Sequence, residues 1–237
     1  MSVITISGNI GSGATEIGRL VAAKLGLDYV DNRILTEAAR TLGVSLRTVE
    51  HHDDRSPPPT LRERLATFFQ DFLERSAVAG VADPLMGTAS LETLMATTYR
   101  EAAALPEVGH EFSESRYKEV LTSIISDLGA KGDVVIIGRG GQAILKGRPG
   151  CLHVCATAPF DVRVRCIAER DRVPEAQARE LVEESDKGRM DYHHKYFRVN
   201  PTDPNLYDLV LNTAHLSHES AAELIVAALR FKMPASA

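Results

Sequence analysis

A glycine-rich stretch near the N-terminus has the composition of a phosphate-binding loop. Residues 8–15 read Gly-Asn-Ile-Gly-Ser-Gly-Ala-Thr and lie between a short apolar run and a helical pattern. Glycines let successive backbone N–H groups turn toward one point, and the start of a helix adds partial positive charge. We expect phosphate contacts from Gly8, Gly11, Ser12, Gly13, Ala14 and Thr15, with Mg²⁺ held by the Thr15 hydroxyl. The alternative is a tight strand-to-helix turn without a ligand.

The loop lacks one residue of the full pattern. A Walker A motif has a lysine after its last glycine, and here that position is Ala14. The lysine normally delivers a positive charge to the β- and γ-phosphates of the nucleotide. The motif is therefore degenerate, and another cation must supply this charge if the loop binds a triphosphate.

Several arginines follow predicted elements at places where a phosphate could be bound. Arg139 comes directly after the most hydrophobic run of the chain, hence at the carboxyl edge of a sheet, where open α/β folds bind ligands. Two predicted helices further on carry Arg163, Arg170 and the segment Asp186-Lys187-Gly188-Arg189. A guanidinium donates two parallel hydrogen bonds to phosphate, and a cluster can neutralise a transferring phosphoryl group. The alternative for Arg139 is a surface ion pair, and the alternative for the arginines of the predicted helices is a solvated amphipathic face.

Five short apolar runs and the helical patterns between them indicate how these residues are positioned. Strands are predicted at residues 3–7, 28–30, 134–138, 152–156 and 208–212. Ile17, Leu20, Val21 and Leu25 form one helical stripe that ends at Gly26. Apolar strands that alternate with helices predict a parallel sheet in a doubly wound α/β domain, because parallel strands need crossover connections.

Residues 31–131 break this alternation, since they contain helical patterns and loop signals but no convincing strand. We expect a helical insertion at about residues 53–115 within a single domain that spans residues 1–237. The insertion could pack on the core, form a homodimer contact, or act as a mobile lid. It holds no motif that identifies a substrate.

Composition excludes several classes of protein. The chain has 237 residues, 44% of them hydrophobic, and a formal net charge of −5, so no overall charge favours nucleic acid. Its apolar runs are far shorter than the roughly 20 residues of a membrane-spanning helix, and no signal pattern opens the chain. We expect a soluble cytoplasmic protein with neither nucleic-acid nor membrane partners. Its cysteines, Cys151, Cys155 and Cys166, are expected to be buried free thiols without a metal or redox role.

Several motifs occur in the order found in the cytidylate kinase-like family of P-loop proteins. They are Gly11-Ser12-Gly13, Ile137-Gly138-Arg139-Gly140, Asp186-x-x-Arg189 with Tyr192, and the run Tyr207-Asp208-Leu209-Val210-Leu211-Asn212-Thr213. The chain resembles this family over nearly its whole length, and residues 53–112 are the least distinctive part. Bacterial cytidylate kinases have the P-loop lysine and an Asp-Gly-Arg-Asp turn, whereas the cytidylate kinase-like branch often lacks the lysine.

The resemblance implies a P-loop kinase-type three-layer sandwich. Its five-stranded parallel sheet would have the order 2-3-1-4-5, with the nucleoside-monophosphate region after the second strand and an arginine-bearing lid at about residues 171–205. Pro201 and Pro204 would end the lid.

The resemblance also implies roles for individual residues in an ATP- and Mg²⁺-dependent kinase that acts on CMP or dCMP. Arg139 would hold the acceptor phosphate, Arg163 or Arg170 the donor, and Lys187 with Arg189 would close over the transferring group. Asp31 and Asp186 would contact the substrate. Two rival hypotheses stay open: a nucleotide-binding pseudokinase or regulator without turnover, and a structural or oligomerisation module.

Overall fold

The computed structural model describes residues 2–31 and 114–232, and the predicted insertion lies outside these residues. Five strands form one parallel sheet: β1 (Val3–Gly8), β2 (Asp28–Val30), β3 (Val134–Ile137), β4 (Cys151–Thr157) and β5 (Leu209–Asn212). The strand order is β2-β3-β1-β4-β5, as expected from the resemblance. The glycine loop therefore follows the central strand.

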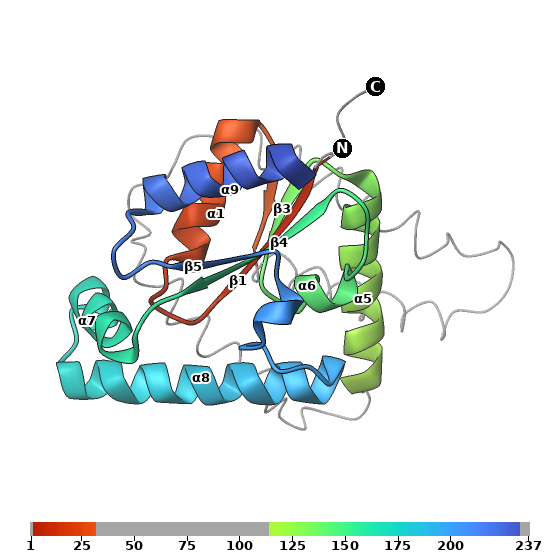
Figure 1. Ribbon diagram of the computed structural model, residues 1–237. Helices are drawn as coiled ribbons and strands as arrows, with labels where there is room; N and C mark the ends of the chain where they lie inside the picture. The colour runs from red at the N-terminus through yellow and green to blue at the C-terminus, as the bar shows by residue number, and fades with distance from the viewer. Residues whose placement is uncertain (1, 32–113, 233–237) are drawn as a thin grey trace, which may run out of the picture.

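Helices cover both faces of this sheet (Figure 1). In chain order they are α1 (Ala14–Leu25), α5 (Glu114–Lys131), α6 (Gly141–Ile144), α7 (Phe160–Asp171), α8 (Glu175–Phe197) and α9 (His218–Lys232), with a 3₁₀ turn at Pro204–Leu206. The layers are α1 with α9 on one side, and α5, α6 and α8 on the other. The doubly wound α/β prediction and the three-layer sandwich are confirmed.

The strands are apolar on both faces because each face is covered by helices. Ile4 and Ile6 of β1 pack with Ile17 of α1 and Ile225 of α9. Residues that point to the other face of the sheet, such as Val3 of β1 and Ile136 of β3, pack with α5 and the end of α8. Burial of both faces explains why these strands read as continuous apolar runs and not as alternating ones.

The predicted strand ends agree with the observed ends or differ from them by one residue. β3 ends at Ile137 because Gly138 has a positive φ of 71°, which leaves the extended region. β4 is longer than expected because it pairs with β1 on one side and β5 on the other. The turns that follow β3 and β4 therefore begin at Gly138 and Ala158, at the carboxyl edge of the sheet.

α8 is one helix of 23 residues, and it contains the whole Asp186–Arg189 segment. It begins after Pro174, which cannot donate a backbone hydrogen bond, and ends where Arg198 adopts a left-handed conformation with φ of 56°. α8 spans most of the predicted lid, residues 171–205, and lies along the base of the molecule in Figure 1. The described part of the chain holds no helix long and apolar enough to cross a membrane.

Candidate functional site

The glycine loop connects β1 to α1 at the carboxyl edge of the sheet. Gly11 and Gly13 both have φ of 76°, a left-handed conformation that costs glycine little. Gly13 is the residue before the first turn of α1, and no side chain caps that helix. The first backbone N–H groups of an α-helix have no partner within the helix, so this end of α1 can donate hydrogen bonds to an anion.

Close packing around the loop leaves no room for a side chain at its glycines. A Cβ atom at Gly8 would lie 2.5 Å from Ser12 Oγ, and one at Gly11 would lie 2.9 Å from the carbonyl oxygen of Arg163. A Cβ atom at Gly13 would lie 2.3 Å from Nε2 of His218, the first residue of α9. The loop therefore packs tightly on itself and against two helices, α7 and α9.

Two hydroxyl groups of the loop fit the magnesium nucleotide that the motif predicts. Thr15 is buried in the first turn of α1, where the motif predicts the Mg²⁺ contact. Ser12 Oγ is buried and has no hydrogen-bond partner among the described residues. A buried hydroxyl without a partner is costly unless a ligand completes its hydrogen bonding. The side chain of Ala14 is also buried, and no ammonium occupies that position.

Thr213 ties the loop to the strands on its other side. Its Oγ1 lies 3.0 Å from the carbonyl oxygen of Ser12 and 3.2 Å from that of Thr157. The Thr213 backbone N–H also donates to the Thr157 carbonyl. The segment after β5 therefore fixes the central part of the glycine loop.

Arg163 is fully engaged in holding the loop to α7 and α8. Its two Nη atoms bind the two carboxylate oxygens of Asp186 at 3.0 and 2.8 Å, and Nε donates to the Ala158 carbonyl at 3.0 Å. Nη1 also donates to the Ile10 carbonyl, and Asn9 Nδ2 donates to Asp186 at 2.7 Å. Arg163 and Asp186 lie at the predicted site, but their contacts in the structure are with each other and with the loop backbone.

Arg170 and Lys187 lie away from these contacts. Arg170 is in the last turn of α7, about 10 Å along the helix from Arg163, and it forms a bidentate ion pair with Asp171. Lys187 is exposed on α8. Arg170 is therefore held by its neighbour Asp171, and Lys187 faces solvent.

Arg139 lies at the carboxyl edge, beside the central strand, as its position after an apolar strand predicts. It is 1% exposed, with φ of 51°, and lies between Gly138 and Gly140, which also have positive φ. Its guanidinium carbon is 5.6 Å from the ring centroid of Tyr192 on α8. The Gly138 N–H donates to the Ile6 carbonyl, which joins this turn to β1. Arg139 is thus a buried cation and not an exposed one.

Arg189 reaches the same edge from α8. It is 2% exposed, and Nη2 donates to Ser7 Oγ at 2.9 Å, to the Pro201 carbonyl at 3.3 Å and to Tyr207 Oη at 3.4 Å. Its Nε is buried without a hydrogen-bond partner in the described residues. Ser7 directly precedes the glycine loop, so this guanidinium already lies beside the start of the loop.

His193 lies near both arginines, one turn after Arg189. Its Nδ1 is 2.8 Å from the Arg189 carbonyl oxygen, so Nδ1 must carry the proton and donate it. Burial, followed by the positive charges of Arg189 and Arg139, lowers the pKa of His193 to about 4. His193 is therefore neutral at pH 7, and its buried Nε2 is a hydrogen-bond acceptor with no partner among the described residues.

Other predicted residues have simpler outcomes. Asp31 is half-buried at the end of the edge strand β2 and contributes to the raised pKa of Tyr29, whose main cause is burial. Cys151 and Cys155 are buried free thiols as expected, but Cys166 is exposed because it lies on the outer face of α7. Burial raises the pKa of Cys151 to about 12.

The described part of the chain contains no group of three or more His, Cys, Asp or Glu residues that could hold a metal ion.

Sequence reasoning missed several residues that complete the site. Ser7, Asn9, His193 and His218 were not predicted, because single polar residues on a strand, loop or helix carry no spacing signal. Tyr207 was noted only as part of a motif, although it accepts a hydrogen bond from Arg189 and donates one to the Pro201 carbonyl at 2.8 Å.

Comparison with known proteins identifies the family. The cytidylate kinase of Methanopyrus kandleri is 29% identical over 107 residues, 42% of this chain and 55% of that protein, so the chain spans about half of this relative. The cytidylate kinase of Staphylothermus marinus is 26% identical over 232 residues, 95% of this chain and 94% of that protein. An uncharacterized protein from Eubacterium ventriosum has the same fold, with a TM-score of 0.62 at 15% identity over 97% of this chain and 99% of that chain. The sequence profile of the Cytidylate kinase-like family matches residues 3–215, and the chain belongs to this family.

Proposed function

We propose that the protein transfers a phosphoryl group from ATP to a nucleoside monophosphate, with CMP or dCMP as the favoured acceptor. The observation that carries the proposal is the burial of Arg139 and Arg189 at the sheet edge that also holds the glycine loop. Arginines at the ligand-binding edge of an α/β sheet are well placed to bind an anion, because each guanidinium can donate two parallel hydrogen bonds to a phosphate group. The family match and the named cytidylate kinases support the nucleotide as that anion.

Each group has a separate task in this proposal. Backbone N–H groups of the loop and the start of α1 would bind the phosphates of ATP, and Thr15 would hold Mg²⁺, which neutralises phosphate charge when bound. Arg139 would bind the acceptor phosphate. Arg189 would stabilise the transferring group and replace the charge that Ala14 lacks. Phosphoryl transfer depends mostly on positioning and charge, so the missing lysine does not by itself prevent it.

The proposal gives no direct phosphate contact, in the arrangement seen here, to Arg163, Arg170 or Lys187. We propose that Arg163 and Asp186 position the loop through their ion pair and do not bind nucleotide directly in this arrangement. A lid movement at residues 171–205 would be needed to bring Lys187 to the phosphates. A homodimer formed through residues 53–115 is a separate proposal, and these residues lie outside the described part of the chain.

The experiment is a screen for ATP consumption with CMP, dCMP, UMP, AMP and small hydroxylated metabolites. Detection of CDP or dCDP as the main product supports the proposal, and transfer to another acceptor corrects only the substrate. A protein that binds ATP but transfers to none of these acceptors is a nucleotide-binding regulator, the alternative that Ala14 favours. A thermal shift with ATP and Mg²⁺ separates these cases from a structural module, which would show no shift.

A further inference from the structure

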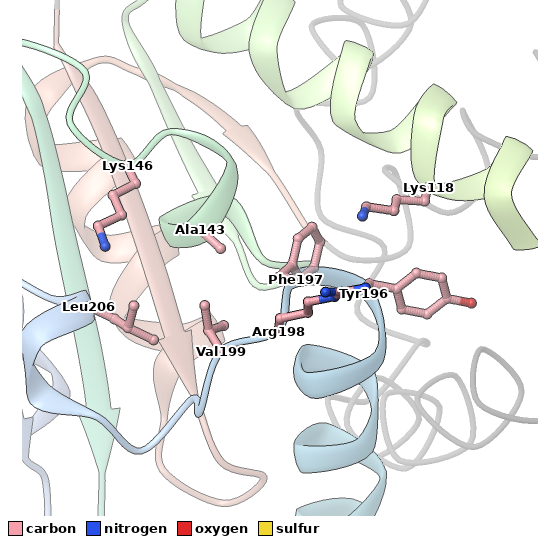
Figure 2. A pocket seen from close by; sticks show the side chains of 8 residues that line it. All are labelled: Lys118, Ala143, Lys146, Tyr196, Phe197, Arg198, Val199 and Leu206. Carbon is pink, nitrogen blue, oxygen red and sulfur yellow. The ribbon is translucent and has the colours of Figure 1, made fainter.

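A pocket lies beside α6, at the end of α8 (Figure 2). It is a pocket of about 350 Å³ between α5, α6, the end of α8 and the 3₁₀ turn. Its lining includes Lys118 of α5, Lys146 after α6 and Arg198, and none of the described residues that line it is acidic. In Figure 2, Lys118 and Arg198 approach from the side of α5 and α8, whereas Lys146 lies on the side of α6 near Leu206.

These three cations differ from many others in the molecule because they lack carboxylate partners among the described residues. Six basic side chains elsewhere in the described residues form ion pairs: Lys24 with Glu223, Lys131 with Asp28, Lys232 with Asp208, Arg163 with Asp186, Arg170 with Asp171 and Arg179 with Asp161. Three unpaired positive charges around one pocket produce a local positive potential, although the net charge of the chain is −5.

The floor of the pocket is apolar and aromatic. Tyr196 is buried and Phe197 is half-buried, and Leu206 adds an aliphatic wall. Ligand sites typically combine an apolar lining with a few polar groups that fix orientation. A phosphate group alone would be bound by the cations but would leave this floor without a contact.

We propose that this pocket binds a small organic phosphate, with its phosphate group beside Lys118 and Arg198 and its apolar or aromatic part on Tyr196 and Phe197, toward Lys146. The site is separate from the glycine loop, none of whose residues line it. It adjoins the Arg139 turn through one residue, because a Cβ atom at Gly140 would lie 2.2 Å from the Phe197 ring. A ligand in the pocket would therefore contact the ring that packs on that turn.

Arg198 allows a test in which the fold is preserved. Its φ of 56° is the left-handed conformation that ends α8, and glycine is the residue best suited to that position. Arg198→Gly thus removes a charge from the pocket without straining the backbone. Arg172→Gly is the matched control, because Arg172 ends α7 with φ of 55°, is exposed and does not line the pocket.

The readout is protection of individual lysines from a limiting amount of an amine-acylating reagent, followed by peptide mass spectrometry on the full chain. Phenyl phosphate is the probe, and inorganic phosphate and phenol are compared with it. We expect phenyl phosphate to protect Lys118 and Lys146 but not Lys187, which is exposed on α8. Arg198→Gly should raise the half-protecting concentration about tenfold, as loss of one charge-assisted hydrogen bond implies, and Arg172→Gly should leave it unchanged.

Three results would overturn the proposal. They are no protection of Lys118 and Lys146 by phenyl phosphate, equal protection in the Arg198→Gly and wild-type proteins, and equal potency of phenyl phosphate with either inorganic phosphate or phenol. The last result would show that the pocket does not recognise the two parts of the ligand together. None of these results bears on phosphoryl transfer at the glycine loop, so the two proposals fail independently.

Discussion

Arg139 reaches the sheet edge through a left-handed backbone conformation that few non-glycine residues adopt. We predict that Arg139→Asn raises the KM for CMP by about 30- to 100-fold, because a bidentate, charge-assisted contact with phosphate is lost. Asparagine tolerates the same φ, so the fold should be retained. Steady-state kinetics and circular dichroism check both points, with Arg148→Ala as a control in the loop after α6. An unchanged KM would remove Arg139 from the acceptor site.

His193 gives the protein a specific dependence of stability on pH. Burial and the nearby Arg189 and Arg139 lower its pKa to about 4 in the folded state, against about 6.5 in an unfolded chain. The unfolded state thus binds more protons between these values, so stability falls as the pH drops from about 6.5 to 4. From this group we expect a loss of about 2 kcal/mol in unfolding free energy between pH 7 and pH 5.

Urea unfolding at the two pH values measures this loss. His193→Gln should show a smaller difference between pH 7 and pH 5 than the wild type. His194→Gln is the matched control, because His194 is the adjacent, exposed residue of the same helix. Equal pH dependence in all three proteins would show that His193 is not held neutral by its surroundings.

At the scale of elements, α9 and the glycine loop depend on each other through Gly13 and His218. We predict that Gly13→Ala lowers stability by more than Gly26→Ala, although both glycines have positive φ. Gly26 has open space where a Cβ would lie, so its substitution costs only the strain of about 1 kcal/mol. Gly13→Ala adds a collision with the His218 ring.

The double substitution Gly13→Ala/His218→Ala isolates the collision. It should recover the part of the loss that exceeds the Gly26→Ala value, and thermal or urea unfolding provides the comparison. If Gly13→Ala and Gly26→Ala cost the same, the α9 contact does not constrain the loop.

The predicted lid, residues 171–205, should be less stable than the sheet. We predict faster amide exchange across residues 171–205 than in β1 and β4, because lid elements are drawn from the less stable parts of a structure. ATP with Mg²⁺ should slow that exchange. Hydrogen exchange with mass spectrometry measures both rates. Exchange in α8 as slow as in the central strands would assign it to the fixed core, where Val182 and Tyr192 already pack.

The sequence predicted elements better than it predicted contacts. Apolar runs located the five strands. The position of Arg139 directly after one of these runs placed it at the carboxyl edge of the sheet, because parallel strands all end at the same edge. Spacing could not tell that Arg189 is buried and Lys187 exposed, since both lie on one helix and only the packing of that helix decides which side faces the sheet. Likewise, the sequence predicts Arg163 as a phosphate ligand, but in the structure it forms an ion pair with Asp186, which lies 23 residues later in the chain.

For the whole molecule, the central question is how a loop without its lysine could support phosphoryl transfer. Arg189 is linked to β1 through Ser7, to the 3₁₀ region through Tyr207 and to α8 through its own backbone, so its charge is held in place by the fold. Preorganised charge favours the transition state, since no rearrangement is needed when negative charge shifts during the reaction. The fold would thus replace a flexible lysine with a fixed arginine.

The most direct test compares ATP binding and CDP formation in the wild type, Arg189→Ala and Arg189→Lys. With ATP, Mg²⁺ and CMP, the wild type should form CDP. Arg189→Ala should lower turnover by at least about 100-fold while changing the Kd for ATP only a few-fold, because the contact matters mainly in the reacting state. Arg189→Lys should restore part of the turnover, and circular dichroism should show all three proteins folded. Equal losses of ATP binding and turnover in Arg189→Ala, or a wild type that binds ATP and forms no CDP, would contradict this account.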